Sequence, residues 1–285
     1  MIISKIIGGL GNQLYQYAAG RTLSILNNTR LKLDVSGFDE YKLRNFGLQS
    51  FNCNVDFASE NEINNLLPVH NFEKAFQYLS PLGKRTYYRE KHFHFDENVL
   101  KMGPDVYLNG YFQSQKYFLP TEKTIREELS LKKEAISKVE SFSNILKNQN
   151  SVSVHFRRAD FASDPVSAEY HGILSKEYYL NAVALVVSKL SNPAFYVFSD
   201  DINWAKEKLK NHGATFVSGE ISKNHFEDLY LMSRCRHNII ANSSFSWWGA
   251  WLNNNPEKIV IAPERWFNKG PKDTQDLIPE GWIRI

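Results

Sequence analysis

Several features that mark common protein classes are scarce or absent in this 285-residue chain. It has two cysteines, Cys53 and Cys235, which are far apart and follow no ligand spacing, so neither a disulfide scaffold nor a zinc site is expected. No apolar run approaches the roughly 20 residues of a membrane span, and residues 1–7 are too short for a signal peptide. We therefore expect free thiols, no transmembrane segment and a cytoplasmic location.

Neither sign of charge dominates, since 34 lysines and arginines stand against 31 aspartates and glutamates. Nucleic-acid-binding domains usually carry a strong basic excess, so nucleic acid is not an expected partner, although a local anion site remains compatible. Internal repeats and low-complexity stretches are also lacking. The 42% of hydrophobic and 14% of aromatic residues provide enough apolar surface for a folded chain. At about 100–200 residues per domain, the length predicts two packed domains.

The N-terminal residues predict a strand, a helix and a second strand. Residues 2–7 are a short apolar run, apolar or small side chains then recur at helical spacing over 15–25, and residues 31–35 alternate. This pattern is typical of a β-loop-α-β unit.

Residues 38–147 give a weaker signal of mixed helical segments. Within them, residues 84–94 are basic and aromatic, which fits an acceptor-site lining, a contact with anionic lipid headgroups, or a solvated face. Residues 122–150 are polar and helix-rich, and we place the domain boundary at their end.

Strand-like and helix-like patterns alternate regularly between residues 151 and 263. The expected strands and helices lie, in chain order, at 152–156, 178–190, 195–198, 204–210, 215–217, 227–234, 238–241, 246–252 and 259–261. Such alternation predicts a doubly wound parallel sheet, which binds ligands at the carboxyl ends of its strands. Residues 161–172 are polar and lack apolar periodicity, so we expect a loop there, either facing an acceptor or on the ordinary surface.

The first polar strand end is residues 155–160, which read HFRRAD. Its two arginines are forked donors suited to bidentate recognition of phosphate, beside side chains that accept protons. The alternative is one surface arginine and one arginine bound to Asp160.

The second polar strand end is residues 198–201, which read FSDD. A carboxylate there can accept from a nucleobase N–H or a ribose hydroxyl, or it can cap the helix that begins near Ile202. Capping is the expected role of at least one of Asp200 and Asp201.

The third polar strand end is residues 241–251, which read ANSSFSWWGAW. Serines at a strand-to-helix turn can present O–H and backbone N–H donors to a phosphate at the positive end of the helix. An ordinary serine N-cap before a tryptophan-rich core helix is the alternative, and the two roles are compatible.

A glycine-rich loop, residues 8–14 (GGLGNQL), follows the first expected strand. It begins like a dinucleotide-binding loop, but Leu14 stands where the third glycine is required, and the Walker lysine is absent. We interpret the glycines as allowing close approach of the backbone to a ligand, with a plain tight turn as the alternative.

Together, residues 8–13, 155–160 and 242–251 resemble glycosyltransferase family 11, the α-1,2-fucosyltransferases, and more distantly the α-1,6- and protein O-fucosyltransferases. Their order and spacing match across essentially the whole chain, least well in the middle of the first half. Two residues depart from the family's HxRRGD-like pattern: Ala159 replaces its glycine and Phe161 its tyrosine. The methyl group that Ala159 adds would limit how closely the backbone approaches the substrate.

The resemblance implies an α/β fold of GT-B type, with two Rossmann-like domains facing across a cleft. Residues 1–149 would form the N-terminal, acceptor-side domain, and residues 150–285 the C-terminal domain that binds GDP-fucose. The implied reaction is inverting transfer of L-fucose from GDP-β-L-fucose to the 2-hydroxyl of a terminal galactoside in a glycan. With a lipid-linked glycan, the enzyme would make peripheral contact with the inner face of a membrane.

The resemblance also implies roles for residues of the second half. Arg157 would bind the donor pyrophosphate, His155 would lie against the nucleotide, and Asp200, next to Ser199, would read guanine. The phosphates would be held by Ser243, Ser244 and Phe245.

In the first half, the resemblance assigns the sugar-facing role to the glycine-rich loop. Asn12, Gly9 and Gly11 would face the fucose, with Asn12 taking part in catalysis. In the other half, Arg158 would brace its own motif through Asp160.

The chain contains no Asp-X-Asp triplet, so the metal clamp of many glycosyltransferases has no obvious ligands and no metal or cofactor is expected. Arg157 would supply the positive charge instead. The sequence does not identify the base that takes the acceptor hydroxyl proton: Asp160 ranks first, and Asp164 and Glu169 are the other candidates. A GT-B transferase of another nucleotide sugar, or a non-catalytic nucleotide- or glycan-binding protein, stays open as an alternative.

Overall fold

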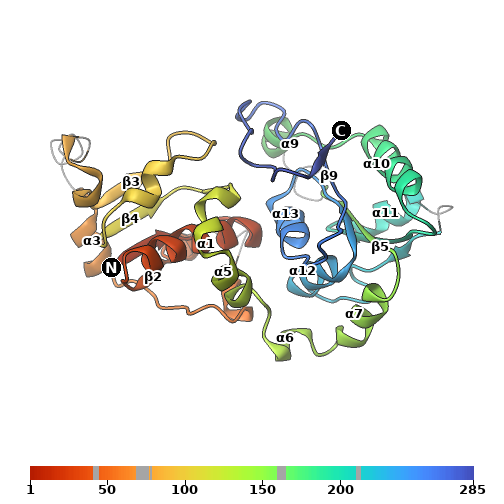
Figure 1. The fold of residues 1–285 in the computed structure, drawn as a ribbon, viewed down its shortest axis with the longest axis horizontal. Helices are drawn as coiled ribbons and strands as arrows, with labels where there is room; N and C mark the ends of the chain where they lie inside the picture. Colours follow the sequence, from red (N-terminus) through yellow and green to blue (C-terminus); the bar gives the residue numbers. More distant parts are fainter. Residues whose placement is uncertain (41–44, 69–76, 78, 159–164, 210–212) are drawn as a thin grey trace. The chain divides into compact units, whose positions relative to one another are not determined.

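The computed structural model describes residues 1–40, 45–68, 77, 79–158, 165–209 and 213–285. Tertiary contacts divide the chain into two compact units (Figure 1). Unit 1 contains Met1–Ser130 and Asp273–Pro279, and unit 2 contains Leu131–Lys272 and Glu280–Ile285. The chain therefore passes between the units three times.

The first passage lies earlier in the chain than the boundary expected between residues 149 and 150. Helices α6 (Lys133–Ile136) and α7 (Glu140–Lys147) pack against α12 (His225–Arg234), which belongs to unit 2. Leu146 of α7 is fully buried. Because these short helices bury their apolar side chains in unit 2, they belong to it although they are polar in sequence.

The second and third passages arise because residues 273–279 return to unit 1. Asp276 accepts a hydrogen bond from the backbone N–H of Phe95 at 2.9 Å and forms an ion pair with Lys116. Asp273 lies 3.2 Å from the His94 ring, which stacks on His92. His94, at the end of the basic and aromatic stretch 84–94, therefore holds the returning segment together with Phe95 and Lys116. The local sequence does not predict this contact.

Unit 1 is built on a four-stranded parallel sheet in the order β2-β1-β4-β3. The strands are β1 (Ile2–Lys5), β2 (Leu31–Asp34), β3 (Tyr87–Arg89) and β4 (Val106–Asn109). Helix α1 (Leu10–Leu26) is the crossover from β1 to β2. The other helices are α2 (Gly37–Glu40), α3 (Glu60–Leu66) and α5 (Glu122–Glu128), with 3-10 turns η1 (Leu48–Ser50), η2 (Leu82–Lys84), η3 (Glu97–Lys101), η4 (Gln115–Tyr117) and η5 (Leu119–Thr121).

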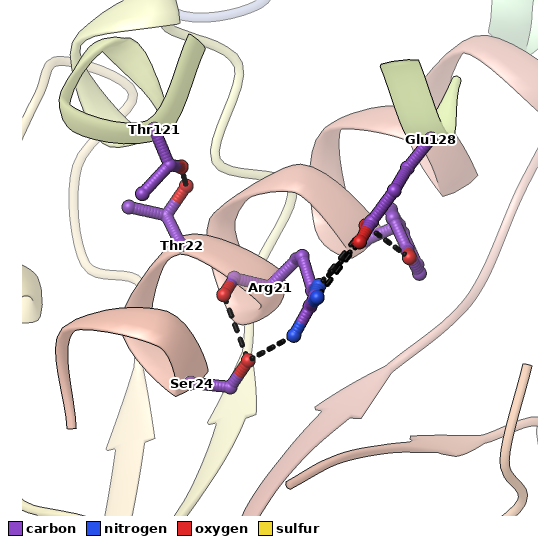
Figure 2. A network of polar contacts seen from close by, with 6 residues as sticks. Arg21, Thr22, Ser24, Thr121 and Glu128 are labelled. Carbon is purple, nitrogen blue, oxygen red and sulfur yellow. Dashed lines mark hydrogen bonds and ion pairs between the residues drawn. The ribbon is translucent and has the colours of Figure 1, made fainter. Parts of the chain in front are cut away.

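Helix α1 lies close against the sheet and is fixed to α5 by polar contacts. A Cβ on Gly20 would lie 3.0 Å from the Cβ of Ser4, so only glycine allows this approach. Figure 2 shows the guanidinium of Arg21 clamped on the Glu128 carboxylate, at 2.7 Å from Nη2 to Oε1. The hydroxyl of Tyr17 donates to the other Glu128 oxygen at 2.6 Å. This network sets the direction of α1, whose N-terminus carries the glycine-rich loop.

Unit 2 is built on a six-stranded parallel sheet in the order β10-β9-β8-β5-β6-β7. Its strands are β5 (Ser151–Phe156), β6 (Ala194–Ser199), β7 (Thr215–Phe216), β8 (His237–Ile239), β9 (Val260–Ala262) and β10 (Ile283–Arg284). The helices not yet given are α9 (Pro165–His171), α10 (Lys176–Lys189), α11 (Ile202–Leu209) and α13 (Ser244–Trp251). Figure 1 shows α10 and α11 on one face of this sheet and α12 and α13 on the other.

The strands and helices expected between residues 151 and 263 are confirmed, and the parallel order is that of a doubly wound sheet. Two expectations were wrong. Strands β3 and β4 lie in the region expected to contain mixed helical segments. Helix α9 occupies part of the expected loop 161–172; proline opens it and Gly172, at φ +76°, follows its end.

Candidate active site

The strand order of unit 2 places the site beside β5. The chain runs from β5 outward to β6 and β7, and then returns to the other side of β5 with β8. Ligands of doubly wound sheets bind at the carboxyl ends of the strands where the order reverses. The loops that follow β5 and β8 flank this point, and they contain Arg157 and residues 240–243.

An ion pair joins the ends of β5 and β6. Arg157 Nη1 lies 2.8 Å from Asp200 Oδ2, and the backbone N–H of Arg158 donates to Asp200 Oδ1 at 2.8 Å. Side chains of Arg157 and Asp200 are each 21% exposed. Both carboxylate oxygens of Asp200 thus face the arginine pair, so this side chain fixes where the Arg157 guanidinium lies.

The second arginine packs on the helix that follows β6. The guanidinium of Arg158 lies 4.6 Å from the ring centre of Trp204, and its Nε is 3.5 Å from Asp201 Oδ2. Asp201 Oδ1 also accepts from the N–H of Trp204 at 3.2 Å, which confirms that one of the two aspartates caps α11. The brace expected from Asp160 cannot be compared, because Asp160 lies outside the described residues.

Ser199 is tied into the fold. It is buried, its N–H donates to Ser218 Oγ at 3.1 Å, and its hydroxyl accepts from the N–H of Asp201 at 3.0 Å. Ser218 in turn donates to Asp228 at 2.8 Å. The side chain of Ser199 therefore holds the turn after β6.

The N-terminus of α13 lacks a side-chain cap. Ser243 is the N-cap residue, yet its side chain accepts no capping hydrogen bond, and the first turn has no acidic residue. The orphan N–H groups of Ser244 and Phe245 therefore meet no acceptor within the described ranges and suit an anion. The expected core role is also confirmed, because the tryptophans of α13 are buried: Trp247, Trp248 and Trp251.

Asn242 precedes this N-terminus and organises the segments around it. Its Nδ2 donates to the backbone oxygens of His171, Gly172 and Trp266 at 3.0 to 3.1 Å. The Oδ1 atom is buried and has no hydrogen-bond partner in the described part of the chain. In the sequence, Asn242 is visible only as part of the ANSSFSWWGAW motif, which does not predict this role.

His155 lies inside unit 2 near the end of β5. Its ring is buried and lies 5.7 Å from the ring of Phe245, centre to centre. Burial lowers the pKa of this histidine, so the ring is neutral at physiological pH. Nδ1 has no partner among the described atoms, and buried polar atoms rarely stay unpaired. A nucleotide placed against Phe245 would lie near it.

In unit 1, two glutamines shape the glycine-rich loop. Gly8 has φ +77°, and Gly9 is the N-cap residue of α1 without a side-chain cap bond. Gln13 donates to the Gly8 oxygen at 2.9 Å, and Gln16 accepts from the N–H of Ile7 at 2.9 Å. Both glutamines are buried. These hydrogen bonds fix the conformation of the loop. The GGLGNQ motif contains Gln13, but the sequence does not predict this role for either glutamine.

Asn12 lies in the first turn of α1, next to the helical Gly11. Its Oδ1 accepts from Gln113 Nε2 at 2.9 Å, and a Cβ on Gly8 would lie 2.9 Å from its Nδ2. The structure therefore brings Gly9, Gly11 and Asn12 together in unit 1, and the arginine pair, His155, Asp200 and residues 243–245 together in unit 2.

Of the three candidate bases, the structure describes only Glu169. Asp160 and Asp164 lie outside the described residues, as do the departures at Ala159 and Phe161. Glu169 is exposed on α9 and forms an ion pair with Lys269. Glu169 is thus engaged at the surface by a lysine.

Across the described residues, no group of three His, Cys, Asp or Glu side chains could hold a metal ion. Likewise, none of the helices in the described ranges combines the length and apolar character of a membrane span.

Comparison with known proteins places the chain in a family. The Glycosyl transferase family 11 model matches residues 4–285. An α-1,2-colitosyltransferase of Escherichia coli is 34% identical over 297 residues, covering 100% of this chain and 99% of the relative. Human galactoside α-(1,2)-fucosyltransferase 1 is 25% identical over 98% of this chain and 73% of its own length. A mutant of Arabidopsis thaliana FUT1 in complex with GDP aligns with TM-score 0.55 and 12% identity, over 93% of this chain and 71% of that one. The chain belongs to glycosyltransferase family 11, and its two α/β units have the fold of the GT-B fucosyltransferases.

Proposed function

We propose that this protein is an inverting α-1,2-fucosyltransferase that moves L-fucose from GDP-β-L-fucose to the 2-hydroxyl of a terminal galactoside. The observation that carries the proposal is the ion pair of Arg157 with Asp200. This pair lies beside the point where the strand order reverses, between β5 and β8, and α13 follows β8 in the chain. The family assignment and the α-1,2 linkage in the names of the relatives support it.

In this proposal, unit 2 binds the donor. Arg157 neutralises the pyrophosphate, and the N-terminus of α13 supplies N–H donors from Ser244 and Phe245 together with the Ser243 hydroxyl. His155, neutral and buried, lies against the nucleotide. We assign Asp200 to the orientation of Arg157 in place of guanine recognition, because both of its oxygens already face the arginine pair.

In unit 1, we assign substrate binding to the glycine-rich loop. Asn12 offers an amide N–H, because its oxygen is engaged by Gln113. GDP leaves as an anion when the acceptor hydroxyl, which gives its proton to a base, attacks from the opposite face of the sugar, and this inverts the β-linkage of the donor to α. Preorganised positive charge at the leaving group is worth roughly 10²–10³ in rate per donor removed. Arg157 supplies this charge without a metal ion.

A second donor is favoured by a specific observation. The 34% identical relative is an α-1,2-colitosyltransferase, and colitose is fucose without its 3-hydroxyl. A site built to hydrogen-bond that hydroxyl would reject GDP-colitose by about 10⁴-fold, whereas a site shaped for colitose would accept both sugars less selectively.

The proposal is tested by offering the purified protein GDP-fucose, GDP-colitose, UDP-galactose and dTDP-rhamnose with the same β-galactoside and measuring release of the nucleotide and glycosylated product. We expect transfer from GDP-fucose. Transfer only from a UDP- or dTDP-sugar would show that the donor is not a GDP-sugar. Binding of GDP without transfer from either GDP-sugar would make the protein a nucleotide-binding protein.

A further inference from the structure

Glu90 closes a turn at the ligand-binding edge of the sheet in unit 1. It follows the last residue of β3, and its carboxylate accepts from the backbone N–H of Tyr111 at 2.6 Å and of Phe112 at 3.1 Å. These residues follow the neighbouring strand β4. Phe112 is fully buried at φ +52°, a backbone conformation that non-glycine residues adopt only when the surroundings impose it.

The packing of this turn against Glu90 leaves no spare room. A Cβ on Gly110 would lie 2.5 Å from the Cβ of Glu90 and 2.9 Å from its Oε2. The ring of Phe112 lies 6.2 Å from Tyr88 and 5.3 Å from Tyr117, centre to centre. The Glu90 side chain is therefore a built-in part of the turn.

The same turn holds the glycine-rich loop in two places. The Gly110 oxygen accepts from Gln16 Nε2 at 3.1 Å, and Gln16 Oε1 accepts from the N–H of Ile7. Gln113, at the other end of the turn, donates to Asn12 Oδ1 at 2.9 Å. Strand order makes this possible, because β1 and β4 are neighbours and the order reverses between them.

The bond from Gln113 decides what Asn12 offers to a ligand. An asparagine amide presents an oxygen acceptor on one side and two N–H donors on the other. Because its oxygen is occupied, Asn12 keeps its Nδ2 as the donor side, and this atom lies beside Gly8, whose missing Cβ leaves room for it. Reversal of the amide would present an acceptor, which would repel a phosphate oxygen.

We propose that Glu90 is a positioning residue that fixes the turn at 110–113 and, through Gln113, orients the Asn12 amide as a donor to the substrate. The inference rests on the proposed function for the identity of the ligand. The carboxylate must be ionised for this task, because each oxygen accepts one N–H. A protonated oxygen would bring an O–H donor against a backbone N–H donor.

The surroundings of Glu90 move its pKa into the neutral range. Burial raises the pKa of Glu90 to about 7, against the two backbone N–H donors, which lower it. The titratable groups facing it are Tyr88 on β3 and Tyr117 on η4; burial raises the pKa of both, so they stay neutral. Its neighbours Arg89 and Lys91 are exposed. One of the two backbone N–H groups therefore loses its acceptor as pH falls through about 7, while the fold around Glu90 is not destabilised, because burial favours the protonated form.

The first test compares Glu90→Gln with Glu128→Gln. Glu128 is a matched control, because it is also a half-buried glutamate that clamps elements of unit 1, but on the α5 side of α1 (Figure 2). We expect E90Q to lower kcat/KM for the GDP-sugar by on the order of 10²-fold, as misplaced binding groups do, and to flatten the acid limb of the pH profile near pH 7. We expect E128Q to lower the unfolding midpoint and keep that limb. An E90Q profile with the wild-type limb would overturn the inference.

The second test does not depend on turnover. The side-chain amide of Asn12 is followed by ¹⁵N-¹H NMR, with its signal assigned through Asn12→Asp. We expect its shift to titrate with a midpoint near pH 7 in the wild type, and to be displaced and pH-independent in E90Q. An Asn12 signal that is unaffected by pH and by E90Q would contradict the inference. Absence of transfer by the wild type alongside a titrating Asn12 signal would overturn the proposed function and leave the Glu90 assignment standing.

A third variant tests the route through Gln113. Gln113→Ala should lower kcat/KM about as much as E90Q, and the double variant should lose little more than either single variant, because both act on Asn12. Strictly additive losses would show that Glu90 acts by another route and would overturn the inference.

Discussion

Arg157 Nη1 lies 2.8 Å from Asp200 Oδ2, and this ion pair joins the loops after β5 and β6 at the site edge of unit 2. The pair is only partly buried, so its value is less in stability than in geometry. It holds a guanidinium where the strand order reverses, close to where the α13 N-terminus offers further donors.

The first prediction concerns the charge itself. Arg157→Ala should lower kcat by roughly 10²–10³-fold, because the leaving GDP loses its main positive partner, while the unfolding midpoint changes little. Steady-state kinetics and thermal unfolding measure the two quantities. Arg236→Ala is a matched control, since Arg236 also forms a surface ion pair in unit 2 with Glu257, and it should keep full activity. Near-normal turnover of R157A would show that Arg157 does not stabilise the leaving group.

The second prediction separates the two adjacent aspartates. Asp200→Ala should lose transfer without adding to the loss in R157A, because Asp200 acts by holding Arg157. Asp201→Ala should instead lower the free energy of unfolding by about 1 kcal/mol, because Asp201 caps α11.

A nucleotide comparison tells whether Asp200 reads guanine instead. IDP lacks the 2-amino group of GDP, so a guanine-reading aspartate would create a preference for GDP that D200A abolishes. We expect D200A to retain the wild-type ratio of affinities for GDP and IDP, measured by calorimetry. A ratio near one in D200A, with a preference for GDP in the wild type, would show that Asp200 recognises guanine.

Much of unit 2 could be predicted from sequence, and the reason is physical. The buried strand β5 has the alternating Val152, Val154 and Phe156, and the capped helix α10 follows Ser175, so local patterns specify both elements. The arginine pair and the serine-rich turn were also visible as strand ends. Neutral His155 and the engagement of Asp200 were not, because both depend on which strands become neighbours.

In unit 1, the determining contacts connect residues far apart in the chain. Glu90 meets a turn that follows a different strand, and Gln113 reaches back to Asn12. Asp276 pairs with Lys116 from between the two segments of unit 2, which is why one cut near residue 150 does not describe the two units. Nothing in the local sequence around Glu90 distinguishes it from an ordinary surface glutamate.

The third prediction concerns the nucleotide. A ligand that binds only the folded protein stabilises it by about 2.7 kcal/mol at a concentration 100 times its Kd. GDP should therefore raise the unfolding midpoint clearly, while UDP and dTDP at equal concentration should have little effect. The comparison is made by scanning fluorimetry, with R157A as the control that abolishes the GDP shift. Equal shifts for all three nucleotides would mean that the site recognises only the diphosphate.

The fourth prediction concerns metal ions. If Arg157 and the α13 N-terminus carry the charge compensation, then EDTA should leave the transfer rate within experimental error of the untreated enzyme. Initial rates before and after chelation, and after adding Mn²⁺ or Mg²⁺, measure this. A loss of activity that Mn²⁺ restores would show that a metal shares the task.

The central claim is that this chain transfers fucose from GDP-fucose to the 2-hydroxyl of a galactoside with inversion. The most direct test incubates the protein with GDP-β-L-fucose and a panel of terminal galactosides and determines the linkage of the product by NMR. We predict an α-1,2-linked fucose on galactose, formed by the wild type and not by R157A. A product with a β-linkage or a linkage to another hydroxyl, or no product with any galactoside, would contradict the claim.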